Sequence, residues 1–177
     1  MKRLAVSAAL AACVPLAMTS FARAADQPAA PATAPAATPA AANPLDEIPE
    51  AMPFAQPYGA PVGLQTAQSL VAAAVAEATK RNWQMSFSVV DWGGTPVAFA
   101  RMDGANLASA EIAGLKAATA VKFRRPTKVF EGGIQGKGFN YLLSLPNVLA
   151  SRGGIPLVAD GKVIGAIGCS GGTGSQD

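Results

Sequence analysis

The chain has 177 residues, half of them hydrophobic and 14% charged, and it contains no histidine. Its net charge of +3 and isoelectric point near 9.1 would ordinarily suggest an acidic partner such as nucleic acid. However, three of the 14 basic residues, Lys2, Arg3 and Arg23, lie in an N-terminal segment that resembles an export signal. The remaining 11 basic residues equal the 11 acidic ones, so we expect no nucleic-acid partner.

Composition also excludes several kinds of active site. Without histidine there is no serine–histidine or cysteine–histidine nucleophile system, and the commonest metal ligand is missing. Cys169 is the one cysteine outside the N-terminal segment, which excludes an intramolecular disulfide and a zinc or iron–sulfur cage. The carboxylates are spread singly, with Asp91 and Asp160 before glycines in predicted turns. We therefore expect no catalytic carboxylate pair and no metal site.

Residues 1–24 have the layout of a secretory signal peptide. A basic head precedes an apolar run over residues 4–18, and small residues permit cleavage after Ala24. This predicts a periplasmic or secreted protein. A lipoprotein anchored at Cys13 is the alternative, because residues 10–13 resemble a lipobox. The apolar run is short and contains Pro15, so we expect no stable membrane span.

Residues 25–61 predict a linker. The stretch is rich in alanine and proline, has few large apolar side chains to bury and is expected to be extended and disordered. Its last part, residues 45–61, carries more apolar residues and is expected to lie over the domain surface or over a neighbouring subunit. The folded domain is predicted to span residues 62–177.

The first half of this domain predicts a helix followed by a hairpin. Apolar residues recur at helical spacing over residues 64–81, which indicates an amphipathic helix. Residues 85–90 and 96–101 have the composition of two strands, and the turn residues 91–94 join them.

The next elements are predicted to be helical. Ser109 is a good N-cap for a helix that places Glu111 in its first turn and ends near residue 124, before Pro126. Pro126 can start a short helix over residues 127–131. Four glycines between 132 and 138 then predict a mobile loop, followed by a helical turn at 141–144.

The C-terminal part predicts a second hairpin and a glycine-rich tail. Strands over residues 154–159 and 162–170 are joined by Asp160 and Gly161, a strong hairpin signal. The tail, residues 171–177, indicates a loop leading into a helix start. Backbone amides of the glycine-rich stretch 168–174 could bind an anion.

Positive charge is concentrated on the second helix and its exit. Between residues 116 and 137 the basic residues outnumber Glu131 by five; they are Lys116, Lys122, Arg124, Arg125, Lys128 and Lys137. Such a run is either a solvated face or a site for ligand carboxylates. Lys116 lies on the apolar stripe of its helix, so it either snorkels at the core edge or lines a pocket.

Six motifs in register resemble the GlcG/HbpS family, which includes the C-terminal domain of PduO-type proteins. They are Val89-Val90-Asp91 with Gly93-Gly94, residues 97–104 (VAFARMDG), Lys116-Ala117-Ala118-Thr119-Ala120, Arg125-Pro126-Thr127, Gly153-Gly154-Ile155-Pro156 and the stretch from Gly165-Ala166-Ile167-Gly168 to Asp177. The resemblance spans residues 62–177. It implies a profilin-like α+β fold, with a mainly antiparallel five-stranded sheet flanked by helices. It also implies assembly into dimers or larger rings. Family members usually carry a further C-terminal helix after the stretch that matches residues 171–177, and this expected helix is missing here.

The family includes haem-binding proteins, so the resemblance implies a binding module for haem or another small carboxylate-bearing ligand. On this hypothesis Arg101, Lys116 and Arg125 pair with ligand carboxylates, while Asp103 and Thr127 orient them. Without histidine, an axial ligand for haem iron would have to be Met102, Tyr141, Cys169 or a hydroxyl such as that of Thr127.

The alternatives are an accessory enzyme acting on small hydroxy acids or aldehydes, for which no general base is evident, and an oligomeric scaffold without a ligand.

Overall fold

The computed structural model describes residues 45, 50 and 55–177. The predicted signal peptide, Cys13 and most of the predicted linker lie outside the described residues. Within them the order of elements is α1 (Leu64–Lys80), β1 (Ser86–Val90), β2 (Pro96–Arg101), α2 (Leu107–Phe123), α3 (Lys128–Lys137), the 3₁₀ helix η1 (Asn140–Ser144), β3 (Gly154–Ala159) and β4 (Lys162–Ser170).

The two predicted hairpins are joined into one antiparallel sheet with the strand order β2-β1-β4-β3. This confirms the α+β class and the antiparallel pairing, but the described residues form four strands and not five. Tyr58 makes only an isolated parallel bridge to Val163. Proline at 57 and 61 removes two backbone donors, which prevents this segment from extending into a strand.

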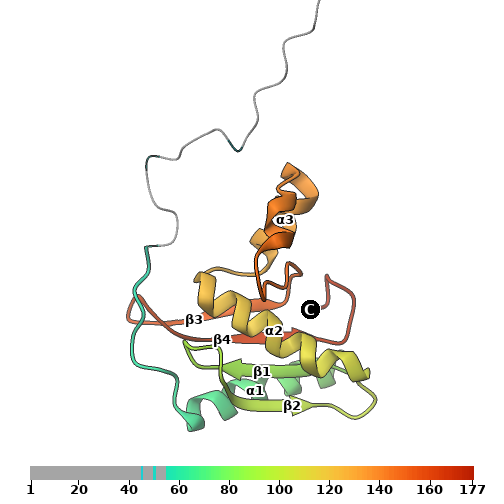
Figure 1. Ribbon diagram of the computed structural model, residues 1–177. Helices are drawn as coiled ribbons and strands as arrows, with labels where there is room; N and C mark the ends of the chain where they lie inside the picture. The colour runs from blue at the N-terminus through green and yellow to red at the C-terminus, as the bar shows by residue number, and fades with distance from the viewer. Residues whose placement is uncertain (1–44, 46–49, 51–54) are drawn as a thin grey trace, which may run out of the picture. The chain divides into compact units, whose positions relative to one another are not determined.

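Helices α1 and α2 cover opposite faces of the sheet (Figure 1). Strand β1 alternates accordingly: Phe87 and Val89 belong to the core on the α1 side, while the hydroxyl of Ser86 meets that of Ser109 on α2 at 2.7 Å. Close approach of α2 requires glycine in the sheet. A Cβ at Gly168 would clash with the carbonyl of Ala113, and one at Gly154 would clash with the carbonyl of Lys116.

Helix α2 begins two residues before the predicted N-cap. Asn106 is the N-cap, and its side chain accepts a hydrogen bond from the Ser109 amide at 2.9 Å. Ser109 is instead buried against the sheet, and Glu111 lies beyond the first turn. The helix ends at Phe123, and its C-cap, Arg124, adopts a left-handed conformation before Pro126.

The predicted mobile loop is wrong, because helix α3 continues through Gly132, Gly133 and Gly136. Tertiary packing explains the difference: a Cβ at Gly133 would lie 3.0 Å from the side chain of Leu142, so a small residue lets η1 pack against α3. Gly138, with φ +68°, ends the helix. The lobe formed by α3 and η1 projects from the sheet near the C-terminal end of α2 (Figure 1).

The end of the predicted linker contacts the domain. Gly59 donates to the Val163 carbonyl at 2.9 Å, and Val163 donates to the Pro57 carbonyl at 2.8 Å. The Tyr58 hydroxyl donates to the carbonyls of Val121 and Lys122 at 3.0 and 3.1 Å. Residues 57–59 therefore lie against β4 and the end of α2.

Candidate functional site

A cavity of about 360 Å³ lies between α3, η1 and the exit of α2. Its size is at the lower end of the range for small-molecule sites. Glycines of α3, which have no side chains, form one part of the wall, and aromatic and cationic side chains form much of the rest. The lining residues are Arg125, Val129, Phe130, Gly132, Gly133, Lys137, Phe139, Tyr141 and Leu142.

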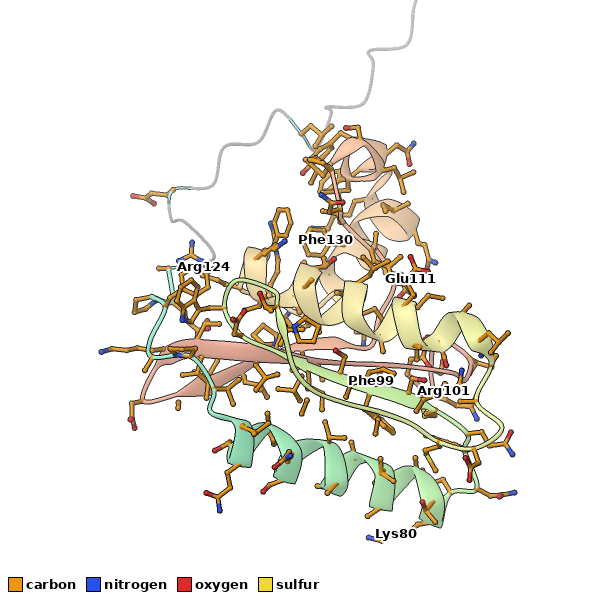
Figure 2. All side chains as sticks on the ribbon, turned by 60° about the horizontal axis from the view of Figure 1, so that its bottom comes forward. Lys80, Phe99, Arg101, Glu111, Arg124 and Phe130 are labelled. Atoms are coloured by element: carbon orange, nitrogen blue, oxygen red, sulfur yellow. The ribbon has the colours of Figure 1, made fainter. Side chains whose placement is uncertain are left out.

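The two cations of this cavity lie against aromatic rings. The Arg125 guanidinium carbon is 4.6 Å from the ring centre of Phe130, and the Lys137 ammonium nitrogen is 5.8 Å from that of Phe139. Burial lowers the pKa of Arg125, an effect that Tyr141 partly opposes. An arginine in a protein nevertheless keeps its charge, so the cavity presents two cations beside apolar rings. Figure 2 shows Phe130 beneath the α3 lobe, facing α2.

Of the four side chains named as possible axial ligands of haem iron, Tyr141 alone lines this cavity. Its side chain is half exposed, and its ring centre lies 6.0 Å from that of Phe139. Met102 is partly buried in the core that α1 covers. The Cys169 thiol donates to the backbone carbonyl oxygen of Asp177 at 2.7 Å and does not line this cavity.

Lys116 points away from the cavity as well. It is 1% exposed, and its ammonium group donates to the Asp177 carboxylate at 2.6 Å and to the Cys169 carbonyl at 3.2 Å. The ammonium group does not snorkel to solvent, and it is not part of the α3 cavity. Its counter-ion is the carboxylate of Asp177.

The remaining predicted ligand residues are not brought together. Arg101 and Asp103 are exposed, at the end of β2 and in the turn that follows it. In Figure 2, Arg101 lies beside the sheet and away from Phe130. Thr127 is fully buried, and its hydroxyl accepts a hydrogen bond from the Gly154 amide at 2.9 Å. Of the five predicted ligand residues, Arg125 alone lines the cavity.

The cluster of basic residues is divided among several places. The Arg124 guanidinium donates to the Gln56 carbonyl at 2.8 Å and lies 5.6 Å from the ring centre of Tyr58. Lys137 lines the α3 cavity, and Lys128 lines a second cavity beside the tail. The basic residues that lie close together in the sequence therefore do not form a single positively charged surface in the folded domain.

Sequence reasoning missed the aromatic half of the site, formed by Phe130 and Phe139. The available signal was the density of aromatic residues between 123 and 141, interleaved with the basic ones. Within the part of the chain that the structure describes, no helix is long and apolar enough to cross a membrane. The same residues hold no group of three or more side chains suited to binding a metal.

Comparison with known proteins identifies relatives of the whole domain. Residues 62–177 match the family described as "Haem degrading protein HbpS-like". The chain is 42% identical over 106 residues to Protein GlcG of Escherichia coli K12, a match that covers 60% of this chain and 78% of GlcG.

Solved structures of related proteins have a similar fold. The fold is similar to that of a double mutant of Streptomyces reticuli HbpS, with a TM-score of 0.62 and 30% identity over 81% of this chain and 91% of the other. It is also similar to the protein in the crystal structure of a PduOC–haem complex, with a TM-score of 0.59 and 32% identity over 66% and 86% of the two chains.

Proposed function

The chain belongs to the HbpS-like family, and from this premise we propose that it binds haem in the cavity between α3 and η1. Support comes from the family and from the haem complex of a structural relative. The observation that carries the proposal is the cavity itself, about 360 Å³ in volume, with aromatic rings and two cations in its wall.

The residues of the cavity fit the chemistry of haem. The ring of Phe139 and the exposed side chain of Val129 offer apolar surface for the porphyrin, and Arg125 and Lys137 offer charge for its two propionates. Phe130 is buried and supports Arg125 from behind. The phenol of Tyr141 is the iron ligand available in the wall. The bound group would supply a redox-active iron. Because the cavity is small for a porphyrin, one edge of haem would extend beyond it.

Haemin titration of the purified protein tests the proposal. We expect a saturable shift of the Soret band and a lower affinity in Arg125→Ala and Lys137→Ala. Tyr141→Phe should change the spectrum of the bound haem, because the phenol oxygen is removed. Tyr58→Phe is the matched control, since its hydroxyl bonds to backbone carbonyls outside the cavity. An unshifted Soret band in the unaltered protein would refute haem binding. Spectral changes in Met102→Leu or Cys169→Ser would reassign the iron ligand.

Export is a second part of the proposal. The N-terminal layout of residues 1–24 supports cleavage after Ala24 and a periplasmic or secreted location. Cell fractionation and N-terminal sequencing of the recovered protein should find a chain that begins at Ala25. A lipid-modified Cys13 would show the lipoprotein instead.

Self-association is the third part. Strand β3 is at one edge of the sheet, and its Ile155 and Val158 side chains are about half exposed. We propose that copies of the chain assemble through the exposed apolar edge formed by β3 into dimers or larger rings. Light scattering coupled to gel filtration should give a mass at least twice that of the chain, and a monomer mass would contradict the proposal.

A further inference from the structure

Lys116 carries a charged group into the interior of the domain. It lies in the middle of α2, the helix that packs directly on β3 and β4, and its side chain is 1% exposed. Burying an ammonium group costs several kcal/mol unless an opposite charge and hydrogen-bond acceptors surround it. The domain must therefore supply an opposite charge and hydrogen-bond acceptors beside the Lys116 ammonium group.

The counter-ion comes from the tail, residues 171–177. One carboxylate oxygen of Asp177 lies 2.6 Å from the Lys116 ammonium nitrogen, and the other accepts a hydrogen bond from the Gly172 amide at 3.1 Å. The Asp177 side chain is 6% exposed. Its carboxylate is thus held by one ammonium group and one backbone amide, which are the groups that bind free carboxylate ligands in proteins.

Space for a ligand adjoins this carboxylate. A cavity of about 290 Å³ has Asp177 in its wall, together with Gly153, Gly154 and Ser175. Gly153, which lines the cavity, also lies against the ammonium group, because a Cβ there would be 3.0 Å from the Lys116 nitrogen and 2.7 Å from the Cys169 carbonyl oxygen. No residue is shared with the wall of the cavity proposed for haem.

The charges around the cavity favour a single negative charge. Arg152, also in its wall, forms an ion pair with Glu131, with nitrogen–oxygen distances of 2.7–3.0 Å. The charge of Lys116 also reaches Glu131, whose pKa it helps to lower. Lys128 also lines the cavity, but it is exposed to solvent. Among the less exposed groups, the cations of Lys116 and Arg152 balance the carboxylates of Glu131 and Asp177, so a dianion in place of Asp177 would leave excess negative charge beside the buried ammonium group.

We propose that Lys116 anchors a binding site for small monocarboxylates, and that the tail fills this site with the Asp177 carboxylate. A free carboxylate and the tail then compete for one ammonium group. Short-chain carboxylates with a small substituent are the ligand class, since the cavity has a volume of only about 290 Å³.

Chemical rescue of Asp177→Ala tests the proposal. The substitution should lower Tm by on the order of 10 °C, because it leaves a buried ammonium group unpaired. Formate or acetate should restore part of this loss saturably, whereas chloride at equal ionic strength, pivalate and inorganic phosphate should not. The matched control is Lys116→Met/Asp177→Ala, which has no buried charge to satisfy and should not respond to acetate.

The unaltered full chain provides a second measurement that does not depend on the folding of the variant. Acetate should saturably shift the amide signals of Gly172 and Asp177 in an ¹⁵N–¹H spectrum and leave the signal of Gly136, in the α3 lobe, unchanged. The proposal is overturned if neither protein responds saturably to acetate. Equal rescue in the Lys116→Met/Asp177→Ala control, or stronger rescue by phosphate, overturns it as well.

Discussion

Thr127 and Gly154 exchange two hydrogen bonds. The Thr127 amide donates to the Gly154 carbonyl at 2.9 Å, and the Gly154 amide donates to the Thr127 hydroxyl oxygen at 2.9 Å. Both residues are buried. The pair ties the residue before α3 to the first residue of β3, and so holds the α3 lobe to the sheet.

Thr127→Val should destabilise the protein although it preserves the shape of the side chain. The substitution leaves the buried Gly154 amide without its acceptor, which costs about 1–3 kcal/mol in the free energy of unfolding. Urea denaturation measures the loss. Thr127→Ser keeps the hydroxyl oxygen and is the control, with an expected loss well below that of valine. Equal losses in the two variants would contradict the prediction, because the hydroxyl oxygen would then contribute no more to stability than the methyl group of Thr127.

Glycine at 168 is predicted to be essential to the packing of α2. Gly168→Ala places a methyl group against the Ala113 carbonyl, so the helix must move away from the sheet. We expect a loss of about 1–3 kcal/mol in the free energy of unfolding, the usual cost of overpacking. Thermal and urea denaturation of the purified variant measure this loss.

Gly136→Ala is the control for this prediction. Gly136 lies within α3 with no atom near its missing side chain. Alanine there should be neutral, or should stabilise the protein by up to about 1 kcal/mol, because glycine is a poor helix former. A Gly168→Ala protein as stable as Gly136→Ala would contradict the close approach of α2 to β4.

Local signals in the sequence were sufficient for the hairpins and for α1. Asp160 and Gly161 form the turn between β3 and β4, and both have positive φ, as such a turn requires. Helix α3 was not predictable in the same way. Its glycines argue against a helix, and the packing of Gly133 on Leu142 overrides that preference through a contact visible only in the fold.

The candidate sites were predictable only in part. Arg125 and Tyr141 were identified individually, but their shared cavity depends on how α3 and η1 pack. Lys116 was recognised as unusual because it interrupts an apolar stripe. Its partner Asp177 is 61 positions away, and no helical or strand periodicity connects them.

The ion pair between Glu131 and Arg152 predicts a loss of stability in acid. Hydrogen bonds from the Arg152 side chain and backbone lower the pKa of Glu131 below its ordinary value of 4.5. The folded state therefore binds the proton less readily than the unfolded state. Its contribution to stability is complete above pH 4.5 and is lost as the pH falls through the lowered pKa.

Urea denaturation between pH 7 and pH 3 checks this expectation. Glu131→Gln should be less stable than the unaltered protein at pH 7, and the difference should shrink toward pH 3. Because the Arg152 side chain is about a third exposed, the difference at pH 7 should be small, about 1 kcal/mol. Glu77→Gln, at an exposed pair on α1, is the comparison. If the difference in the free energy of unfolding between Glu131→Gln and the unaltered protein does not change with pH, protonation of Glu131 is not the cause of the loss in acid.

Cys169 is predicted to resist alkylation in the folded protein. Burial raises the pKa of its thiol to about 11, the negative charge of Asp177 adds to the effect, and Lys116 opposes it. Because the thiolate is the reactive form, iodoacetamide at pH 8 should label Cys169 at least tenfold more slowly in the folded than in the unfolded chain. Peptide mass spectrometry measures this label separately from any label on Cys13.

The same shift has a consequence for stability in alkali. The folded state keeps the Cys169 proton at a pH where the unfolded state has lost it, so this contribution is complete below pH 9 and disappears as the pH rises toward 11. Cys169→Ala removes the titrating thiol and should flatten the decline over that range. Rapid labelling of the folded protein at pH 8 would show that residues 171–177 do not shield this thiol, and would contradict the contact between Cys169 and Asp177.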